Sequence, residues 1–283
     1  ILHRVLDSLY LINNNGLLAS KDFKQKLEDK AVLMLSWLQA IKYQDNSIPN
    51  FNDSTNNIAF HVSDLFEYAK SMDLDWPEAK LNESGYRKFS NSHIECIMDF
   101  GIIGPDYLPG HGHSDIFNFE LYYKSIPFIV DTGTSTYQNN EQRYLERSTQ
   151  SHNTVVVNNA NQSEVWHAFR VGKRAKIIDF IEQENTISAS HNGYKDLNIT
   201  HNRSFTFKEN TITIKDKVHG SKIDNIKSFL HFHPYREIKV LDNKIVIDNQ
   251  IELKFTNYSN IKIKDYKYCM GYNQKIVGKK WLD

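Results

Sequence analysis

Two histidines separated by a single glycine stand immediately before an alternating apolar segment. His111 and His113 flank Gly112 in PGHGHSDIFNFEL, residues 109–121. Side chains two positions apart in extended backbone emerge on one face, so both imidazoles can address the same site. Imidazole can ligate a metal ion, and it can hold or accept a proton near neutral pH. The pair therefore predicts either two ligands of one ion or a ligand beside a reactive group.

Two further residues extend this set. FNFELYY and FIVDTG are separated by the turn-like KSIP, so we expect a hairpin that brings His113 and Asp131 to the same end. His152 begins another β-branched run, NTVVV. Two imidazoles and one carboxylate suit Zn²⁺ and leave Mn²⁺, Fe²⁺ or Ca²⁺ open. The alternative is that each histidine is an ordinary surface or hydrogen-bonded residue, as we expect for the HFH pair at 231–233.

Two arginines are candidates for recognising a carboxylate. Arg143 and Arg147 lie four residues apart in NEQRYLERST, so one helical turn would point both the same way. Arg147 is the better candidate for a bidentate contact. The alternative is a solvated pair bound to Glu141 or Glu146.

Aromatic residues nearby could face a sugar. Tyr137 and Trp166 are candidates, although core packing explains Trp166 equally well. Asn52 and Asp53 lie in a turn-rich stretch and are expected to close a turn between helices.

The first part of the chain has helical periodicity. Ser20 is a candidate N-cap for a helix with apolar residues at steps of three and four up to Ile41, and a second stripe runs from Ile58 to Met72. The opening ILHRVLDSLYLINNNG is also helical in period and lacks a capping residue ahead of it. We therefore expect a few antiparallel helices over residues 1–80, with an exposed apolar face or a contact to an upstream region.

Beyond residue 80 the period of the apolar residues changes to two. Short β-branched or aromatic segments such as RSFTFKEN, TITIKDKV and KIVIDN are split by polar turns, and no connection is long enough for a parallel crossover. The predicted fold class is α+β, in which the helices are followed by a large antiparallel β-sandwich over 81–283.

Composition excludes several classes of protein. The 34 basic and 34 acidic residues balance, so no global field favours nucleic acid or an anionic membrane. No segment is long and apolar enough to predict a membrane span. The two cysteines lack metal-site spacing and are interpreted as buried thiols.

Several segments together carry a family resemblance. GPDYLPGHGHSDIFNFEL, VDTGTSTY, RYLERSTQSHNTVVV and NQSEVWHAFRVGKRA resemble, in order and spacing, the C-terminal sandwich of the heparinase II/III-like polysaccharide lyases. SIPNFNDS and its flanking helices resemble the end of the (α/α) toroid that precedes that sandwich.

The resemblance implies roles for individual residues. His113, Asp131 and His152 resemble the family's metal-binding positions, usually assigned to zinc in a mainly structural role, and His111 resembles its catalytic histidine. It also implies cleavage of a uronic-acid-containing polysaccharide or oligosaccharide by β-elimination, a catalytic tyrosine upstream of Ile1, and a periplasmic or secreted protein. The rival interpretation is a non-catalytic carbohydrate-binding or interaction domain that keeps a structural metal. A homo-oligomer remains open.

Overall fold

Three helices form because their apolar residues recur on one side of each. They are α1 (Leu2–Asn14), α2 (Lys21–Ile41) and α3 (Val62–Lys70). The side chain of Ser20 caps α2 by accepting a hydrogen bond from the backbone N–H of Phe23 at 3.2 Å, as predicted. Leu6, Leu35 and Ala69 are among the fully buried residues of the core that these helices share.

The helices also expose large apolar side chains. Leu11, Phe23 and Leu33 are 54%, 52% and 62% exposed. That these side chains form one apolar face or a contact with another region stays a prediction. The second predicted stripe began at Ile58, but α3 begins only at Val62 and Ile58 is exposed.

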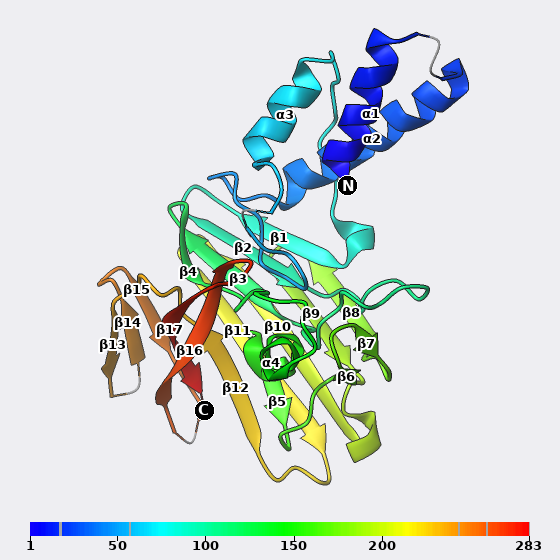
Figure 1. Cartoon of the computed structure of the whole chain (residues 1–283). Helices are drawn as coiled ribbons and strands as arrows, with labels where there is room; N and C mark the ends of the chain where they lie inside the picture. The colour runs from blue at the N-terminus through cyan, green and yellow to red at the C-terminus, as the bar shows by residue number, and fades with distance from the viewer. Residues whose placement is uncertain (17–18, 57, 243, 259, 283) are drawn as a thin grey trace. The chain divides into compact units, whose positions relative to one another are not determined.

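The computed structural model describes residues 1–16, 19–56, 58–242, 244–258 and 260–282. It divides into two units (Figure 1): a helical unit of Ile1–Pro49 with Asn57–Glu83, and a sandwich unit of Asn50–Asn56 with Ser84–Asp283. The short segment at 50–56 therefore belongs with the strands. Asn243, at the end of one predicted strand, lies outside the described residues. No described helix has the length and apolar character to span a membrane.

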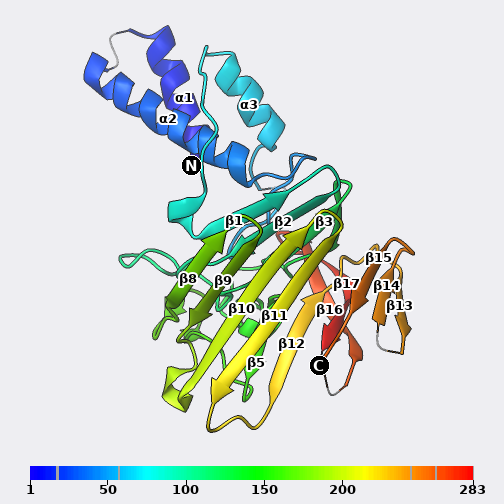
Figure 2. The same cartoon turned by 180° about the vertical axis from the view of Figure 1, so that it is seen from behind.

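The sandwich unit is built from antiparallel sheets, as predicted. One sheet has the order β1-β2-β3-β4, with β1 (Tyr86–Ser90), β2 (Ile94–Asp99), β3 (Phe119–Tyr123) and β4 (Ile126–Ile129). A second sheet has the order β11-β10-β9-β8 and is seen from behind in Figure 2; its strands are β8 (Ile177–Gln183), β9 (Thr186–His191), β10 (Ile199–Lys208) and β11 (Thr211–Gly220).

The remaining strands form smaller sheets. A third sheet has the order β16-β17-β12-β5, with β5 (Val155–Val157), β12 (Ile226–His231), β16 (Lys262–Gly271) and β17 (Gln274–Leu282). A three-stranded sheet contains β13 (Ile238–Leu241), β14 (Lys244–Ile247) and β15 (Ile251–Lys254), and a hairpin contains β6 (Val165–Trp166) and β7 (Arg170–Val171). Strands β1, β2, β6, β7 and β17 were not predicted. For β2 the reason is that all six of its residues are buried, which removes the alternation that reveals a strand.

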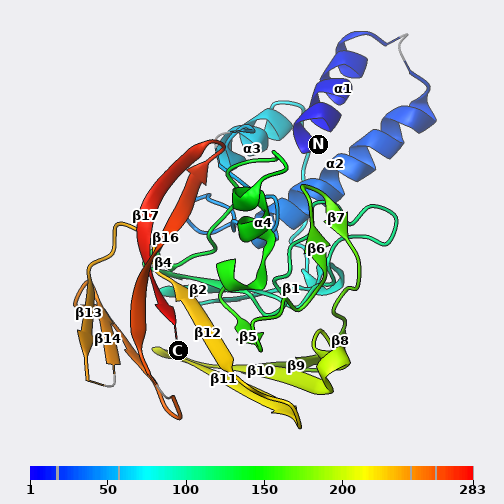
Figure 3. The same cartoon turned by 60° about the horizontal axis from the view of Figure 1, so that its bottom comes forward.

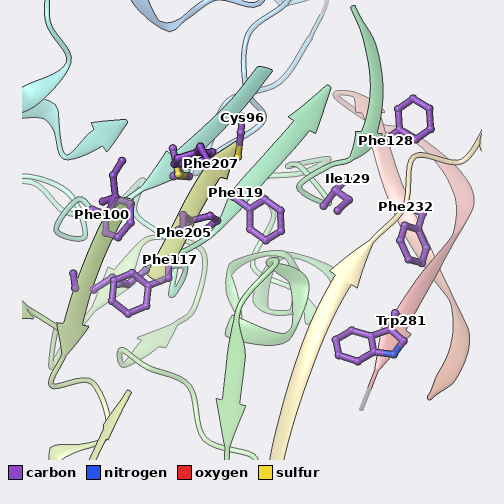
Figure 4. Packing of buried hydrophobic residues seen from close by; sticks show 14 of the residues in the cluster. Cys96, Phe100, Phe117, Phe119, Phe128, Ile129, Phe205, Phe207, Phe232 and Trp281 are labelled. Atoms are coloured by element: carbon purple, nitrogen blue, oxygen red, sulfur yellow. The ribbon is translucent and has the colours of Figure 1, made fainter. Parts of the chain in front are cut away.

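Aromatic side chains fill the space between the first two sheets. Phe89 of β1 stacks on Phe207 of β10 with ring centroids 4.3 Å apart. Phe119 of β3 meets Phe205 of β10 edge-on at 5.5 Å, and both are labelled in Figure 4. Each buried Phe contributes about 1.5–3 kcal/mol through removal of apolar surface from water. This core makes the ends of β3 and β4 a rigid base for the residues that follow.

The β3–β4 hairpin forms where the sequence predicted it. Lys124 and Ser125 connect the strands, and both have positive φ, 51° and 59°. Two consecutive left-handed residues match the twist of paired strands. The predicted hairpin therefore brings the segments that contain His113 and Asp131 to one end of the sheet.

A short helix completes the scaffold. The helix α4 spans Glu141–Arg147 and is capped by Asn140, whose side chain accepts a hydrogen bond from the backbone N–H of Arg143 at 3.0 Å. Figure 3 shows α4 between the β16–β17 and β6–β7 hairpins. Its Glu146 accepts from Ser135 and from Cys269 of β16, whereas its Arg147 donates to the carbonyl of His167, which follows β6. Both predicted arginines thus lie on one helix.

Candidate functional site

The HGH segment is a turn, not the extended backbone that was expected ahead of the strand. Gly112 N–H donates to the Pro109 carbonyl at 2.9 Å. A Cβ at Gly112 would come within 2.4 Å of Ile103, so close packing explains the glycine. As a result the two imidazoles have different surroundings: the His111 side chain is 61% exposed, whereas the His113 side chain is fully buried.

Both histidines contact one carboxylate that the sequence analysis assigned to a turn. Nδ1 of His111 lies 2.7 Å from Oδ2 of Asp53, and Nε2 of His113 lies 3.0 Å from Oδ1. Arg143 donates to both oxygens of Asp53, at 2.8 Å in the contact with Oδ2. The interpretation of Asp53 as a turn residue was therefore incomplete, because a contact across about sixty residues leaves no local signal.

Charge and burial compete at this cluster. Burial opposes ionisation of Asp53, but hydrogen bonds from His113 and Arg143 outweigh it and hold the pKa of the carboxyl well below its usual range. Burial also lowers the pKa of His113 to about 4, although Asp53 acts against this shift. We infer an ionised Asp53 beside a neutral His113 at neutral pH.

Asp131 and His152 form a second buried pair. Nδ1 of His152 lies 2.6 Å from Oδ2 of Asp131, and neither side chain is exposed. Asn118 donates to the same carboxylate oxygen at 2.5 Å, and Gly133 N–H donates to Oδ1 at 2.8 Å. The prediction from the sequence that Asp131 and His152 lie close together agrees with this contact. It did not include Asn118.

A pair of asparagines fixes the backbone around His152. Oδ1 of Asn118 accepts from the backbone N–H of Asn153 at 2.9 Å. The side chain of Asn153 donates to the carbonyls of Phe119 and Val130 at 2.8 and 3.0 Å, and its oxygen accepts from His231 N–H at 2.7 Å. Because these groups are buried and paired, the position of His152 relative to β3 and β4 is strongly constrained.

Two imidazole nitrogens at this centre have no hydrogen-bond partner within the part of the chain that the structure describes. They are Nδ1 of His113 and Nε2 of His152, both buried, and the rings of these residues lie 5.4 Å apart. Unpaired buried nitrogens are costly and suit a ligand that accepts their lone pairs. Among the described residues, however, no three His, Cys, Asp or Glu side chains are grouped closely enough to hold a metal ion. The two imidazole nitrogens are of a type that binds a divalent ion, but the described side chains do not form a complete set of three ligands.

A cavity of about 850 Å³ opens beside His111. The rings of Tyr137 and Phe169 stand 5.9 and 5.5 Å from the His111 ring, and 5.3 Å from each other. The lining residues are Tyr107, Leu108, Pro109, Gly110, His111, Tyr137, Asn139, His167, Ala168, Phe169, Arg170 and Val171. An exposed imidazole in an aromatic cavity suits proton transfer on a ring-shaped ligand.

The two predicted arginines are buried within this wall. Besides Asp53, Arg143 donates to the Ala168 carbonyl at 3.0 Å and stands over the Tyr137 ring at 5.1 Å. Arg147 donates twice to the Gly112 carbonyl, at 3.2 and 3.0 Å. Burial, and then the charge of Arg143, lower the pKa of Arg147 to about 10. Arg147 thus holds the HGH turn in place, and both guanidinium groups hold the loop between β6 and β7.

The two aromatic candidates have different positions. Tyr137 is half-buried and lines the cavity. Trp166 is 39% exposed but is not among the lining residues. Phe169 and Arg170, which do line it, lie in the same stretch as Trp166, and no local pattern of residues would select them.

The sandwich sequence matches a known family over most of its length. Residues 74–279 match the family described as heparinase II/III-like, C-terminal. The chain belongs to this family. The predicted resemblance to heparinase II/III-like proteins is therefore confirmed. The matched region contains His111, His113, Asp131 and His152, and Asp53 lies outside it.

The chain is also similar to individual lyases, at sequence identities of 25% or less. The chain is 25% identical over 274 residues to a heparin-sulfate lyase of Bacteroides stercoris, covering 88% of this chain and 38% of that protein. The crystal structure of the heparan sulfate lyase HepC from Pedobacter heparinus superposes with a TM-score of 0.74 at 17% identity, covering 99% of this chain and 47% of that one. A heparinase III structure gives 0.71 at 19% identity over 99% and 47% of the two chains. This chain thus spans less than half the length of these proteins, and the structures confirm the predicted fold.

Proposed function

We propose that this chain forms the β-sandwich part of a polysaccharide lyase that cleaves uronic-acid-containing glycans by β-elimination. The observation that carries the proposal is the exposed His111, held by Asp53 at the wall of an aromatic cavity. Family membership supports it, and the relative named as a heparin-sulfate lyase makes a glycosaminoglycan the first substrate to test. Alginate, which also consists of uronic acids, is the second.

The chemistry of β-elimination matches what this site offers. The proton at C5 of a uronic acid is weakly acidic until the adjacent carboxylate is neutralised, because the intermediate places further negative charge there. A general base then removes the proton and an acid protonates the leaving O4, each contributing about 10²–10⁴ in rate when well positioned. In this proposal His111 performs one of these proton transfers.

The remaining residues have binding or supporting roles in the proposal. Tyr137 and Phe169 contact the sugar rings, since both line the cavity around His111. Arg170 also lines the cavity and is exposed, so it is the cation best placed for the glycan's carboxylate. Arg143 and Arg147 support recognition indirectly by fixing the cavity wall. Trp166 extends the aromatic surface outside the cavity.

The proposal includes a divalent metal ion held by His113, Asp131 and His152. Zn²⁺ is favoured by the two imidazoles, with Mn²⁺ and Ca²⁺ as alternatives. The buried, unpaired nitrogens of His113 and His152 support it. Such an ion would tie together the segments that precede β3, follow β4 and precede β5.

The decisive experiment uses the full-length gene product and a panel of uronate polysaccharides, including heparan sulfate and alginate. A lyase produces an unsaturated uronate, so ultraviolet absorbance should rise with time. Binding of a glycan by calorimetry without any new product would favour the non-catalytic carbohydrate-binding alternative. New reducing ends without ultraviolet absorbance would indicate a hydrolase and would contradict β-elimination.

A further inference from the structure

Asp53 is the point at which four side chains of the sandwich unit meet. Its own side chain is 6% exposed. It contacts His111, His113 and Arg143, and Thr134 donates to its Oδ1 at 3.3 Å. A carboxylate buried with this many donors has one orientation available to it.

We infer that Asp53 is a positioning residue that sets the tautomer and orientation of His111, an inference that rests on the proposed lyase function. An ionised carboxylate can only accept hydrogen bonds, so Nδ1 of His111 carries the hydrogen in their 2.7 Å contact. The neutral ring then has its lone pair on Nε2. Since His111 is exposed and lines the cavity, Nε2 is the ring nitrogen available to a ligand there.

The Asp53 carboxylate contacts a different ring nitrogen in each histidine, Nδ1 in His111 and Nε2 in His113. Its other oxygen lies 3.0 Å from Nε2 of His113, so that nitrogen also carries its hydrogen. Nδ1 of His113 is consequently the nitrogen with a lone pair, and it is buried with no hydrogen-bond partner among the described residues. Asp53 thus presents Nε2 of His111 to the cavity and Nδ1 of His113 to the buried centre.

The loop that carries Asp53 is itself anchored to the sandwich unit. Asn52 has a φ of 54°, a left-handed conformation that asparagine tolerates better than most residues. Its Oδ1 accepts from the backbone N–H of His113 at 2.9 Å, and its carbonyl accepts from Thr134 at 3.1 Å. The side chain of Asn52 also donates to the Tyr86 hydroxyl at 3.2 Å. The position of the carboxylate is therefore set before any ligand binds.

Arg143 compensates the negative charge of the buried Asp53 carboxylate. It donates to both carboxylate oxygens, and its third donor is used by the Ala168 carbonyl. The guanidinium also stands over the Tyr137 and Phe169 rings at 5.1 and 5.4 Å. The aromatic residues beside His111 and the carboxylate that orients it are thus fixed by one side chain.

The first test reads the histidine tautomers directly by nitrogen NMR of the full chain labelled with ¹⁵N-histidine, at mildly alkaline pH. The His111 signals are assigned by their loss in His111→Gln. In the unmodified protein we expect the Nδ1–H tautomer at His111, and in Asp53→Asn a shift toward the Nε2–H form. Asp106→Asn is the matched control, because Asp106 is an exposed carboxylate paired with Arg174. A predominant Nε2–H tautomer at His111 in the unmodified protein overturns the inference even if Asp53→Asn does not fold.

The second test uses turnover by the full-length protein. Loss of an outer partner of a functional histidine typically costs about 10–100-fold, so we expect Asp53→Asn to lower kcat by that factor with little change in KM. In a His111→Ala background the same substitution should cause a much smaller loss, because the effect through His111 is already gone and only the effect through His113 remains. Equal losses in both backgrounds contradict the positioning role.

The two tests distinguish the inference from the proposed function. If the tautomers respond as expected but no uronate glycan is cleaved, the positioning role stands and the lyase proposal fails. If a glycan is cleaved but the His111 tautomer does not depend on Asp53, the lyase proposal stands and the positioning role fails.

Discussion

Oδ2 of Asp131 lies 2.6 Å from Nδ1 of His152, and both side chains are completely buried. The two residues come from different segments, one following β4 and the other preceding β5. A buried polar pair at this junction is costly unless it is fully partnered. It therefore provides the best place to test for a metal ion.

The first prediction concerns that ion. Elemental analysis of the purified protein should find about one equivalent of a divalent metal, as a site with three protein ligands requires. His113→Ala should lower both the metal content and the melting temperature. His219→Ala is the control, since His219 is exposed on β11. A metal-free protein with unchanged stability in His113→Ala would contradict the metal site.

The second prediction separates His111 from His113. Because His111 is 61% exposed and lines the cavity, His111→Ala should leave the melting temperature and the metal content nearly unchanged. Turnover of a confirmed substrate should fall by about 10²–10⁴-fold, the range for loss of a general acid or base. An unchanged rate of ultraviolet absorbance increase would show that His111 has no role in proton transfer.

The third prediction concerns an ion pair between a buried arginine of β10 and an aspartate of β11 whose side chain is 25% exposed. Arg203, which is 1% exposed, donates to both oxygens of Asp216 at 2.7 and 2.8 Å and also to the carbonyl of Asn153. Asp216→Asn leaves this buried cation without its counter-ion and should lower the free energy of unfolding by about 1.5–3 kcal/mol, the range for a hydrogen bond to a charged group. Asp265→Asn, which removes the exposed partner of Lys279, should change it by less than about 0.5 kcal/mol.

Denaturant titration of these two variants provides the measurement. The pKa of Asp216 is lowered because Arg203 and His201 outweigh the effect of burial. Its contribution to stability is therefore present at neutral pH and is lost as the pH falls below the ordinary value of 3.8. Equal stability of Asp216→Asn and the unmodified protein at pH 7 would show that the pair contributes nothing.

The fourth prediction concerns Lys280, whose surroundings disfavour its charged form. Lys280 of β17 is paired in register with Lys264 of β16 and packs over the Phe229 ring at 5.0 Å. Burial, and then the charge of Lys264, lower the pKa of Lys280 to about 8. Between this value and the ordinary 10.5, the unfolded chain binds more protons at Lys280 than the folded one does, so raising the pH favours folding.

Melting temperatures measured against pH test this directly. Relative to Lys280→Met, the unmodified protein should gain stability as the pH rises from about 8 to about 10.5. Lys264→Gln should reduce this gain, because it removes one cause of the shift. A difference between the unmodified protein and Lys280→Met that does not vary with pH would refute the explanation.

The sequence by itself determined the elements whose signals are local. Ser20 marks the start of α2, the alternating residues of β10 and β11 mark their strands, and KSIP marks the turn between β3 and β4. These signals depend on capping, side-chain period and backbone conformation, which act over a few residues. They suffice to predict the α+β fold and to bring Asp131 and His113 to the same end of a hairpin.

Only the tertiary structure decided the environment of each functional group. Asp53 lies about sixty residues from His111 in the sequence, and nothing local indicates that one carboxylate contacts both histidines. Arg143 was predicted to face a ligand, but its donors are used within the protein by Asp53 and Ala168. The physical reason is that the burial and the hydrogen-bond partners of a side chain depend on which distant segments pack together. Many partners are compatible with the composition, and the packing determines which of them each polar side chain contacts.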